Sequence, residues 1–322
     1  MYFQNQPVLV TGASGLVGSN LIKRLLSEGA AIRATFHKKP PVVVDDRIEY
    51  VQADLTKGED CRRVVEDQRF IFMCAATTSG AAATDATPMV HVTPNLLMYA
   101  QIMEAAYQAN VEKFLWLAST TGYPPSGEKP ISEEEMFIGE PYEKYYFVGW
   151  TKRFIEILSR MYGEKLKRPM TVIVLRPTNV YGPNDDFEFA TSHVIPALIR
   201  KVVERWAPIE VWGTGEDVRD VIYVDDMVEA MVRAMQNIES YVALNIGLGK
   251  GYSIKEILGM ILEVDGYTDA DIIFDISKPT MIPIRLVDTT KAETVLGFKA
   301  QTDLREGLKK TIEWYRQALH IS

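Results

Sequence analysis

The sequence predicts an α/β protein built on a doubly wound parallel sheet. Short apolar runs rich in β-branched residues alternate with stretches whose apolar residues recur at helical spacing, throughout the first half of the chain. Strands joined by crossover helices pair in parallel and are covered on both faces, which explains why each run is apolar throughout. At 322 residues, 47% of them hydrophobic and 24% charged, the chain is long enough for one large domain or two smaller ones.

The first predicted strand leads into a glycine-rich turn. Residues 8–10 are apolar, Gly12, Gly15 and Gly18 follow, and apolar residues at helical spacing continue to Leu26. This order of strand, turn and helix aims free N–H groups and the positive end of the helix dipole at an anion. The pattern is typical of the Rossmann-type turn that binds a dinucleotide pyrophosphate, although a βα turn without a ligand is the plainer alternative. The residues that we expect to contact the cofactor here are Gly12, Ser14, Gly15, Leu16 and Val17.

The second predicted strand, residues 31–36, favours NADP over NAD. Sites that prefer NAD place an acidic residue at the end of this strand, where it binds the ribose 2′-hydroxyl. Here His37, Lys38 and Lys39 follow the strand, and the first acidic residue is Asp45. Because positive charge suits a 2′-phosphate, we expect His37 and Lys38 to contact NADP. NAD remains the alternative cofactor, and a solvated turn that touches nothing is the alternative structure.

The next predicted strands add candidates at the same edge of the sheet. Residues 48–51 lead to Asp54 and Leu55, where the carboxylate could reach the adenine amino group. After a helix at 61–66, the strand at 70–76 ends in Ala75 and Ala76, whose small side chains let a cofactor approach. A helix at 95–109 and a strand at 114–118 then lead to Ser119. In a doubly wound sheet the chemistry lies beyond the carboxyl ends of the strands, which is the position of Ser119.

Composition and charge exclude several classes of protein. The net charge of −8 argues against nucleic acid or an anionic membrane as the main partner. No apolar run approaches the ~18 residues that span a bilayer, and the first residues lack the features of a signal peptide. Cys61 and Cys74 have no metal-binding spacing, and the four histidines are scattered. We therefore expect a reduced, cytoplasmic and metal-free protein.

Taken together, the motifs resemble those of the extended short-chain dehydrogenase/reductases that act on nucleotide sugars, and most closely the GDP-fucose synthases. The likeness covers nearly the whole chain. It rests on residues 11–18, 95–106, 119–124, 177–183, 192–198, 211–215, 219–226, 277–279 and 285–288.

This resemblance implies NADPH-dependent reduction at carbon 4 of a GDP- or other NDP-4-keto-deoxyhexose. Two other functions stay open. One is an NDP-sugar 4-epimerase or dehydratase that keeps NAD bound, and the other is a non-catalytic NADP-binding sensor or scaffold.

Enzymes of this kind use a serine or threonine, a tyrosine and a lysine. By resemblance the serine is Ser119 and the lysine is Lys152, which also contacts the cofactor, but the tyrosine position holds Val148. Valine has no proton to give. One alternative is a hydroxyl from Tyr145 or Tyr146, supplied from a reshaped helix start, and we take Tyr146 as the candidate. Otherwise the reaction uses other groups or the enzyme is crippled, and the two tyrosines serve aromatic packing.

A second departure concerns epimerisation. GDP-fucose synthases pair a cysteine with a histidine to move protons at carbons 3 and 5. His193 matches that histidine, but the cysteine position holds Thr121, whose hydroxyl is too weak an acid to replace a thiol. This substitution argues against a double epimerisation. The alternative role for His193 is a hydrogen bond at a helix N-terminus.

From about residue 177 the pattern becomes mixed, with short strands at 209–212, 242–246 and 272–274. We expect a dinucleotide-binding domain at 1–176 and a smaller mixed α/β lobe at 177–322, interleaved with it and binding the nucleotide sugar. Pro177 is expected on the cofactor side. The resemblance implies that the diphosphate site is lined by Asn179, Lys201, Trp212, Arg219 and Arg285.

Some of these residues have plainer roles available. Trp212 could belong to the core, and Arg219 could pair with Asp220 or Asp225. Trp150, Phe154 and the apolar stripe of the helix at 95–109 could form the two-helix homodimer interface common in the superfamily, or could simply pack against the sheet.

Overall fold

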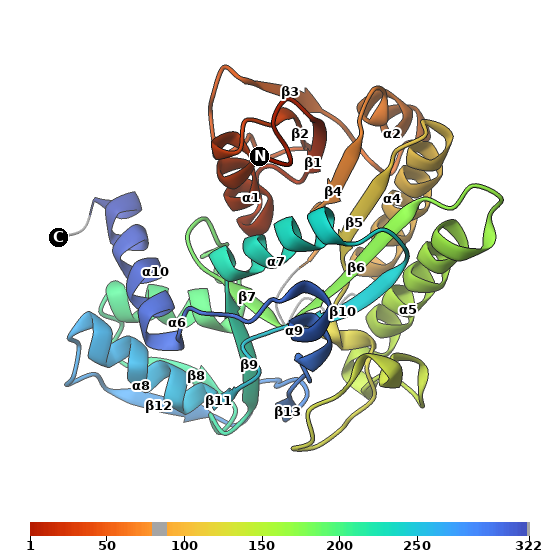
Figure 1. Cartoon of the computed structure of the whole chain (residues 1–322). Helices are drawn as coiled ribbons and strands as arrows, with labels where there is room; N and C mark the ends of the chain where they lie inside the picture. The colour runs from red at the N-terminus through yellow and green to blue at the C-terminus, as the bar shows by residue number, and fades with distance from the viewer. Residues whose placement is uncertain (79–88, 321–322) are drawn as a thin grey trace.

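The computed structural model describes residues 1–78 and 89–320. Its larger part is a seven-stranded sheet in which every neighbouring pair of strands is parallel (Figure 1). This confirms the predicted fold class. In spatial order the strands are β10 (Val242–Ile246), β6 (Thr171–Pro177), β5 (Lys113–Leu117), β4 (Phe70–Met73), β1 (Pro7–Thr11), β2 (Ala31–Phe36) and β3 (Ile48–Gln52).

Helices cover both faces of this sheet, as Figure 1 shows. One face carries α2 (Gly58–Val65), α4 (Met89–Gln108) and α5 (Tyr146–Arg160), and the other carries α1 (Leu16–Ser27) and α7 (Val224–Asn237). The alternation of side chains along β1 divides the core accordingly. Val8 and Val10 belong to the core shared with α1 and α7, whereas Leu9 belongs to the core beneath α2, α4 and α5.

A smaller lobe of mixed sheet and helices follows β6. Its central strand is β9, which pairs in parallel with β7 and β13 and antiparallel with β11, while β8 pairs with β12. The strands are β7 (Asn179–Tyr181), β8 (Ile209–Trp212), β9 (Val218–Tyr223), β11 (Gly251–Ser253), β12 (Ile272–Asp275) and β13 (Ile284–Arg285). The helices are α6 (Val194–Val203), α8 (Ile254–Asp265), α9 (Thr290–Leu296) and α10 (Leu304–Leu319).

The chain passes between the two parts more than once. After β9 it returns to the large sheet through α7 and β10, and α9 packs against both of these elements. Because of these crossings, β9 and β13 of the smaller lobe lie beyond the carboxyl edge of the large sheet (Figure 1).

Short helical turns connect the elements near that edge. They are η1 (Thr120–Gly122), η2 (Glu133–Phe137), η3 (Glu143–Tyr145) and η4 (Met161–Lys165). Helix α4 begins at Met89, six residues before the expected start at Asn95. In the described part of the chain, no helix combines the length and the apolar character needed to cross a membrane.

Candidate active site

The turn between β1 and α1 has the geometry of a phosphate-binding turn. Gly12 has a φ of +74°, and a Cβ there would lie 2.9 Å from the backbone nitrogen of Ala75. A Cβ on Gly18 would lie 2.2 Å from the carbonyl oxygen of Gly12, so α1 approaches this turn closely only without a side chain. Gly15, the N-cap of α1, is exposed, and a Cβ added there would lie 3.5 Å from its nearest neighbour, the carbonyl oxygen of Gly12. The turn is therefore packed on one side and open to a ligand on the other.

Thr11 joins the end of β4 to this turn. Its hydroxyl oxygen accepts hydrogen bonds from the backbone N–H groups of Cys74 at 3.1 Å and Ala75 at 3.0 Å. Ala75 and Ala76 are thereby held beside the glycines, where the sequence predicts cofactor contacts. Thr11 itself was missed by the sequence analysis, although its position directly before Gly12 was an available signal.

The basic segment after β2 also lies against the turn. The Ser14 hydroxyl donates to the Lys39 carbonyl at 2.6 Å, and the side chains of His37 and Lys38 are exposed. Asp54 follows β3, and hydrogen bonds from Thr56 to its carboxylate hold the pKa below its usual value. Since the strands are parallel, these residues, buried Leu55 and Pro177 at the end of β6 share one edge of the sheet.

Ser119 and Lys152 lie at the same edge. Ser119 caps η1, and its Oγ accepts hydrogen bonds from the Thr121 N–H at 3.2 Å and the Thr121 hydroxyl at 3.1 Å. Lys152 is buried in α5, and its Nζ donates to the carbonyl of Leu117, the last residue of β5, at 3.4 Å. Burial lowers the pKa of Lys152 to about 8. Val148 lies one helical turn before Lys152 on the same face, where a tyrosine was expected.

Tyr145 is held by the smaller lobe. It is the last residue of η3 and precedes α5 with a φ of −105°, so it lies outside the helix that carries Lys152. Its phenol lies within the electrostatic influence of Arg219, Arg285 and Asp217 of the smaller lobe. Burial raises the pKa of Tyr145, and the positive charges of Arg219 and Arg285 partly offset this shift. The helix start is therefore reshaped, but in a way that turns Tyr145 to the other lobe.

Tyr146 begins α5 and lies on its exposed side. Its described ring contacts are to Phe147 and Trp150, and 42% of the residue is exposed. These contacts match the alternative of aromatic packing. They do not support the catalytic role that we assigned to Tyr146, because the structure does not bring its hydroxyl to Lys152.

A buried polar network fixes α5 against the segment that carries Ser119. Arg176 of β6 forms an ion pair with Glu156 of α5, and both side chains are 2% exposed. Arg176 also donates to the Tyr123 hydroxyl at 2.6 Å, and that hydroxyl donates to Asn245 at 2.6 Å. This network leaves no signal in the sequence, because its partners come from distant segments and form no local pattern. Breaking one partner of a buried pair leaves a charge uncompensated, so the network holds this geometry firmly.

Two arginines of the smaller lobe lie on neighbouring strands, and one of them contacts this segment. Arg219 of β9 and Arg285 of β13 are paired across neighbouring parallel strands. Arg219 forms an ion pair with Asp217 at 3.1 Å, whereas 4%-exposed Arg285 donates to the carbonyls of Pro124 at 3.0 Å and Tyr123 at 3.3 Å. Burial lowers the pKa of Arg285 to about 10, and its Nε lacks a partner among the described residues. This pair suits an anion such as a diphosphate.

The other predicted substrate residues form no hydrogen bond with this arginine pair in the described structure. Asn179 is exposed, and its side chain donates to the Asp220 carbonyl at 3.3 Å. Lys201 donates to the Glu210 carbonyl at 2.6 Å, and the Trp212 indole donates to the Glu210 carboxylate at 2.8 Å. With 39% of its surface exposed, Trp212 is not a core residue.

His193 is the N-cap of α6, and its side chain makes no capping hydrogen bond. The residue is exposed overall, yet the surrounding protein desolvates its ring enough to lower the pKa, while the charge of Asp186 raises it. Thr121 occupies the position of the missing cysteine, and its hydroxyl donates a hydrogen bond to the Ser119 hydroxyl. The structure thus assigns Thr121 to the support of Ser119.

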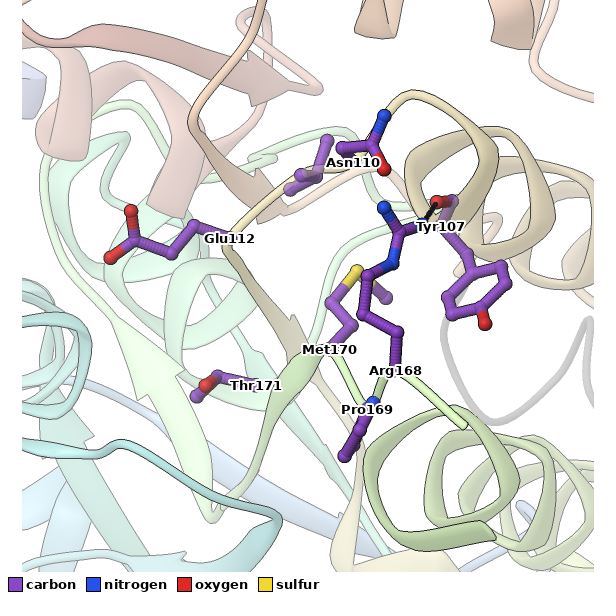
Figure 2. A pocket seen from close by; sticks show the side chains of 8 residues that line it. Tyr107, Asn110, Glu112, Arg168, Pro169, Met170 and Thr171 are labelled. Atoms are coloured by element: carbon purple, nitrogen blue, oxygen red, sulfur yellow. Dashed lines mark hydrogen bonds between the residues drawn. The ribbon is translucent and has the colours of Figure 1, made fainter. Parts of the chain in front are cut away.

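A separate hollow of about 390 Å³ lies at the opposite edge of the sheet (Figure 2). It sits at the amino ends of β5 and β6, where Arg168 donates to the Tyr107 carbonyl at 2.7 Å. None of the predicted site residues lines it. Its lining residues are Tyr107, Asn110, Val111, Glu112, Arg168, Pro169, Met170 and Thr171.

A glycine turn, a basic segment, a serine and a lysine at the carboxyl edge of a parallel sheet define a dinucleotide-dependent oxidoreductase. More specifically, the chain belongs to the NAD dependent epimerase/dehydratase family, whose model matches residues 8–247. It is an NAD(P)-dependent nucleotide-sugar enzyme of the extended short-chain dehydrogenase/reductase type, as the resemblance implied.

Individual relatives span the whole chain. It is 32% identical to GDP-L-fucose synthase of Sinorhizobium fredii, over 95% of this chain and 94% of the relative. It is 30% identical to GDP-L-fucose synthase of Escherichia coli, over 96% of each.

Solved structures agree with this assignment. UDP-glucose 4-epimerase of Thermotoga maritima with UDP-glucose is 25% identical, with a TM-score of 0.88 over 98% of this chain and 100% of that one. MoeE5 in complex with UDP-glucose and NAD is 28% identical, with a TM-score of 0.85 over 97% and 99%.

Proposed function

We propose that the protein reduces the C4 keto group of a nucleoside-diphosphate 4-keto-6-deoxyhexose with NADPH. This is the activity that the resemblance to GDP-fucose synthases implies. The observation that carries this proposal is the position of Arg285. It binds the carbonyls of Tyr123 and Pro124, in the segment that begins at Ser119, and it pairs with Arg219 across two strands. A diphosphate held by this pair places its sugar beside Ser119 and Lys152.

The chain's own residues then bind and orient the sugar. When bound, NADPH supplies a hydride. Ser119 accepts two hydrogen bonds from Thr121, so its own hydroxyl hydrogen stays free to donate to the keto oxygen. A donor aimed at that oxygen stabilises the negative charge that develops as the carbonyl is reduced.

NADPH rather than NADH is favoured by the segment after β2. The bond from Ser14 to the Lys39 carbonyl brings His37 and Lys38 alongside the phosphate-binding turn, with both side chains exposed to a ligand. No acidic side chain follows β2 before Asp45. The positive charge of the lysines in this segment attracts a phosphate.

We also propose a homodimer formed through α4 and α5, which pack side by side. Phe147, Phe154 and Ile157 lie along one side of α5 and are 61%, 55% and 53% exposed, and Leu97 of α4 is 43% exposed. A contiguous apolar surface of this kind on two neighbouring helices is characteristic of a protein interface. Light scattering after gel filtration measures the mass directly.

The first experiment follows the oxidation of NADPH by its absorbance, with GDP-4-keto-6-deoxymannose as substrate and UDP- and dTDP-4-keto sugars as comparisons. Turnover with one of them, lost in Arg285→Ala, supports the proposal. The matched control is Arg168→Ala, in the hollow at the opposite edge.

Two results would point elsewhere. Tightly retained NAD, with interconversion of sugars at C4 and no net oxidation of NADPH, favours an epimerase. Binding of NADPH without turnover of any keto sugar favours the sensor or scaffold that Val148 suggests.

A further inference from the structure

We propose that Lys152 itself, in place of a tyrosine, donates the proton to the keto oxygen in the reduction proposed above. This inference rests on that proposed function, and it concerns the step for which the chain lacks the usual residue.

The tyrosines nearest to Lys152 in sequence or in contact are committed to other interactions. Val148 occupies the position one turn before Lys152. The hydroxyl of Tyr99, whose ring contacts Lys152, is directed at the Leu117 carbonyl at 3.4 Å, and burial raises its pKa far above neutrality. Tyr123 is committed to the network of Arg176 and Asn245. Tyr145 and Tyr146 are held elsewhere, as shown above.

The ammonium group of Lys152 lies in unusual surroundings. It sits 5.2 Å from the ring centre of Tyr99 on α4 and 5.5 Å from that of Trp116 on β5. Its one hydrogen bond to protein in the described structure is to the Leu117 carbonyl. No carboxylate of the described residues forms an ion pair with it, and Glu156 on the next turn is bound to Arg176.

These surroundings make Lys152 able to release a proton. Ring faces and one carbonyl stabilise a cation less well than water does, so burial lowers the pKa to about 8, and no charge on the described residues counteracts this. A lysine in water, with a pKa of about 10.4, holds its proton far more firmly at neutral pH. An acid with a pKa near the working pH is the most efficient proton donor.

The position of Lys152 also suits the step. The carbonyl that it binds belongs to Leu117, two residues before Ser119, so the ammonium lies beside the segment that presents the Ser119 hydroxyl. In the step, the carbonyl carbon gains the hydride that bound NADPH supplies, the carbonyl oxygen takes a proton from Lys152, and NADP⁺ and an alcohol result. The neutral amine of Lys152 then regains its proton from water.

The first test is the Lys152→Arg variant, with folding checked by thermal unfolding and with NADPH binding measured separately. Arginine keeps the positive charge but does not release its proton. We expect turnover to fall at least about 100-fold, and Val148→Tyr added to the same variant to restore part of it. If Lys152→Arg keeps more than about a tenth of the activity, lysine only supplies charge and the proposal is wrong.

The second test is the pH dependence of turnover at saturating substrate. Because the protonated form of Lys152 is the donor, the rate is expected to be constant below pH about 7 and to fall as pH rises through about 8. Tyr146→Phe is the control and should leave this profile unchanged. A rate that stays constant up to pH about 10 contradicts the proposal.

A third measurement does not depend on turnover. NMR of the protein with isotopically labelled lysine side chains, with the Lys152 signal assigned by Lys152→Arg, reports the titration directly. A midpoint near pH 8 supports the proposal, and one above about 10 overturns it. If no keto sugar is reduced, the proposed function fails, and the titration still decides whether Lys152 can act as an acid near neutral pH.

Discussion

The cofactor end of the site is formed mainly by backbone, whereas the catalytic end is formed by side chains. At the cofactor end the backbone makes the site, since Gly12, Gly15 and Gly18 matter for the side chains that they lack. At the catalytic end side chains make it, and there the chain departs at Val148 and Thr121 from the pattern that the resemblance implies.

This difference has a physical reason. A backbone site fails when any atom is added, so it leaves little room for substitution. Val148 is partly buried in the first turn of α5, where a side chain of another kind leaves the helix intact. If Lys152 is the proton donor, as proposed, the chain keeps a backbone frame for the cofactor while a different side chain carries the chemistry.

The largest effect is expected at the cofactor end, from Gly18→Ala. The new Cβ would lie 2.2 Å from the Gly12 carbonyl oxygen, which is backbone and has nowhere to move. We expect the free energy of unfolding to fall by at least about 3 kcal/mol, as overpacking a tight contact does. Urea unfolding followed by circular dichroism measures it.

Gly15→Ala is the matched control, because its Cβ would meet only ordinary contact at 3.5 Å. This variant should unfold like the wild type but bind NADPH at least about tenfold more weakly, since the new methyl group occupies the side that is open to the pyrophosphate. Equal stability of the two alanine variants would show that the turn is not packed as described.

Much of the fold could be predicted because its signals are local. Strand β2 at residues 31–36 and strand β10 at residues 242–246 begin and end where the apolar runs do. The glycine turn, Ser119 and Lys152 each belong to a motif only a few residues long, and parallel strands bring such motifs to one edge.

What could not be predicted depends on contacts between distant segments. The ion pair of Arg176 with Glu156, and the bonds from Arg285 to the Tyr123 segment, join residues that no sequence pattern connects. The placement of Tyr145 depends on where α5 begins, and helix starts are poorly marked when no side chain caps them, as is true of α5.

An intermediate effect is expected where the catalytic end meets the smaller lobe, from Tyr145→Phe. Its hydroxyl lies in the positive field of Arg219 and Arg285, so it is placed to contact the diphosphate and not the keto oxygen. We expect KM for the nucleotide sugar to rise about tenfold, the cost of one hydrogen bond to a charged group, with kcat changed less than about threefold.

Tyr146→Phe is the natural comparison, since Tyr146 lies among surface aromatic rings. Steady-state kinetics of this variant should match the wild type. A fall of about 100-fold in kcat for Tyr145→Phe, with KM unchanged, would make Tyr145 the proton donor and would refute the role proposed for Lys152.

The smallest effect on the site is expected from the far side of the same helix, with Phe154→Glu. Lys152 lies on the buried face of α5, whereas Phe154 is 55% exposed on the face proposed for the dimer. Burying an unpaired carboxylate in an apolar interface is costly, so the variant should run as a monomer in gel filtration with light scattering. NADPH binding should stay as it is, because helix α1, which follows the glycine turn, covers the opposite face of the sheet from α5.

Ile276→Glu, at a 79%-exposed apolar residue of the smaller lobe, is the control and should leave the mass unchanged. A dimer that survives Phe154→Glu would remove α5 from the interface, and one that breaks with loss of NADPH binding would mean that the two faces of α5 are coupled.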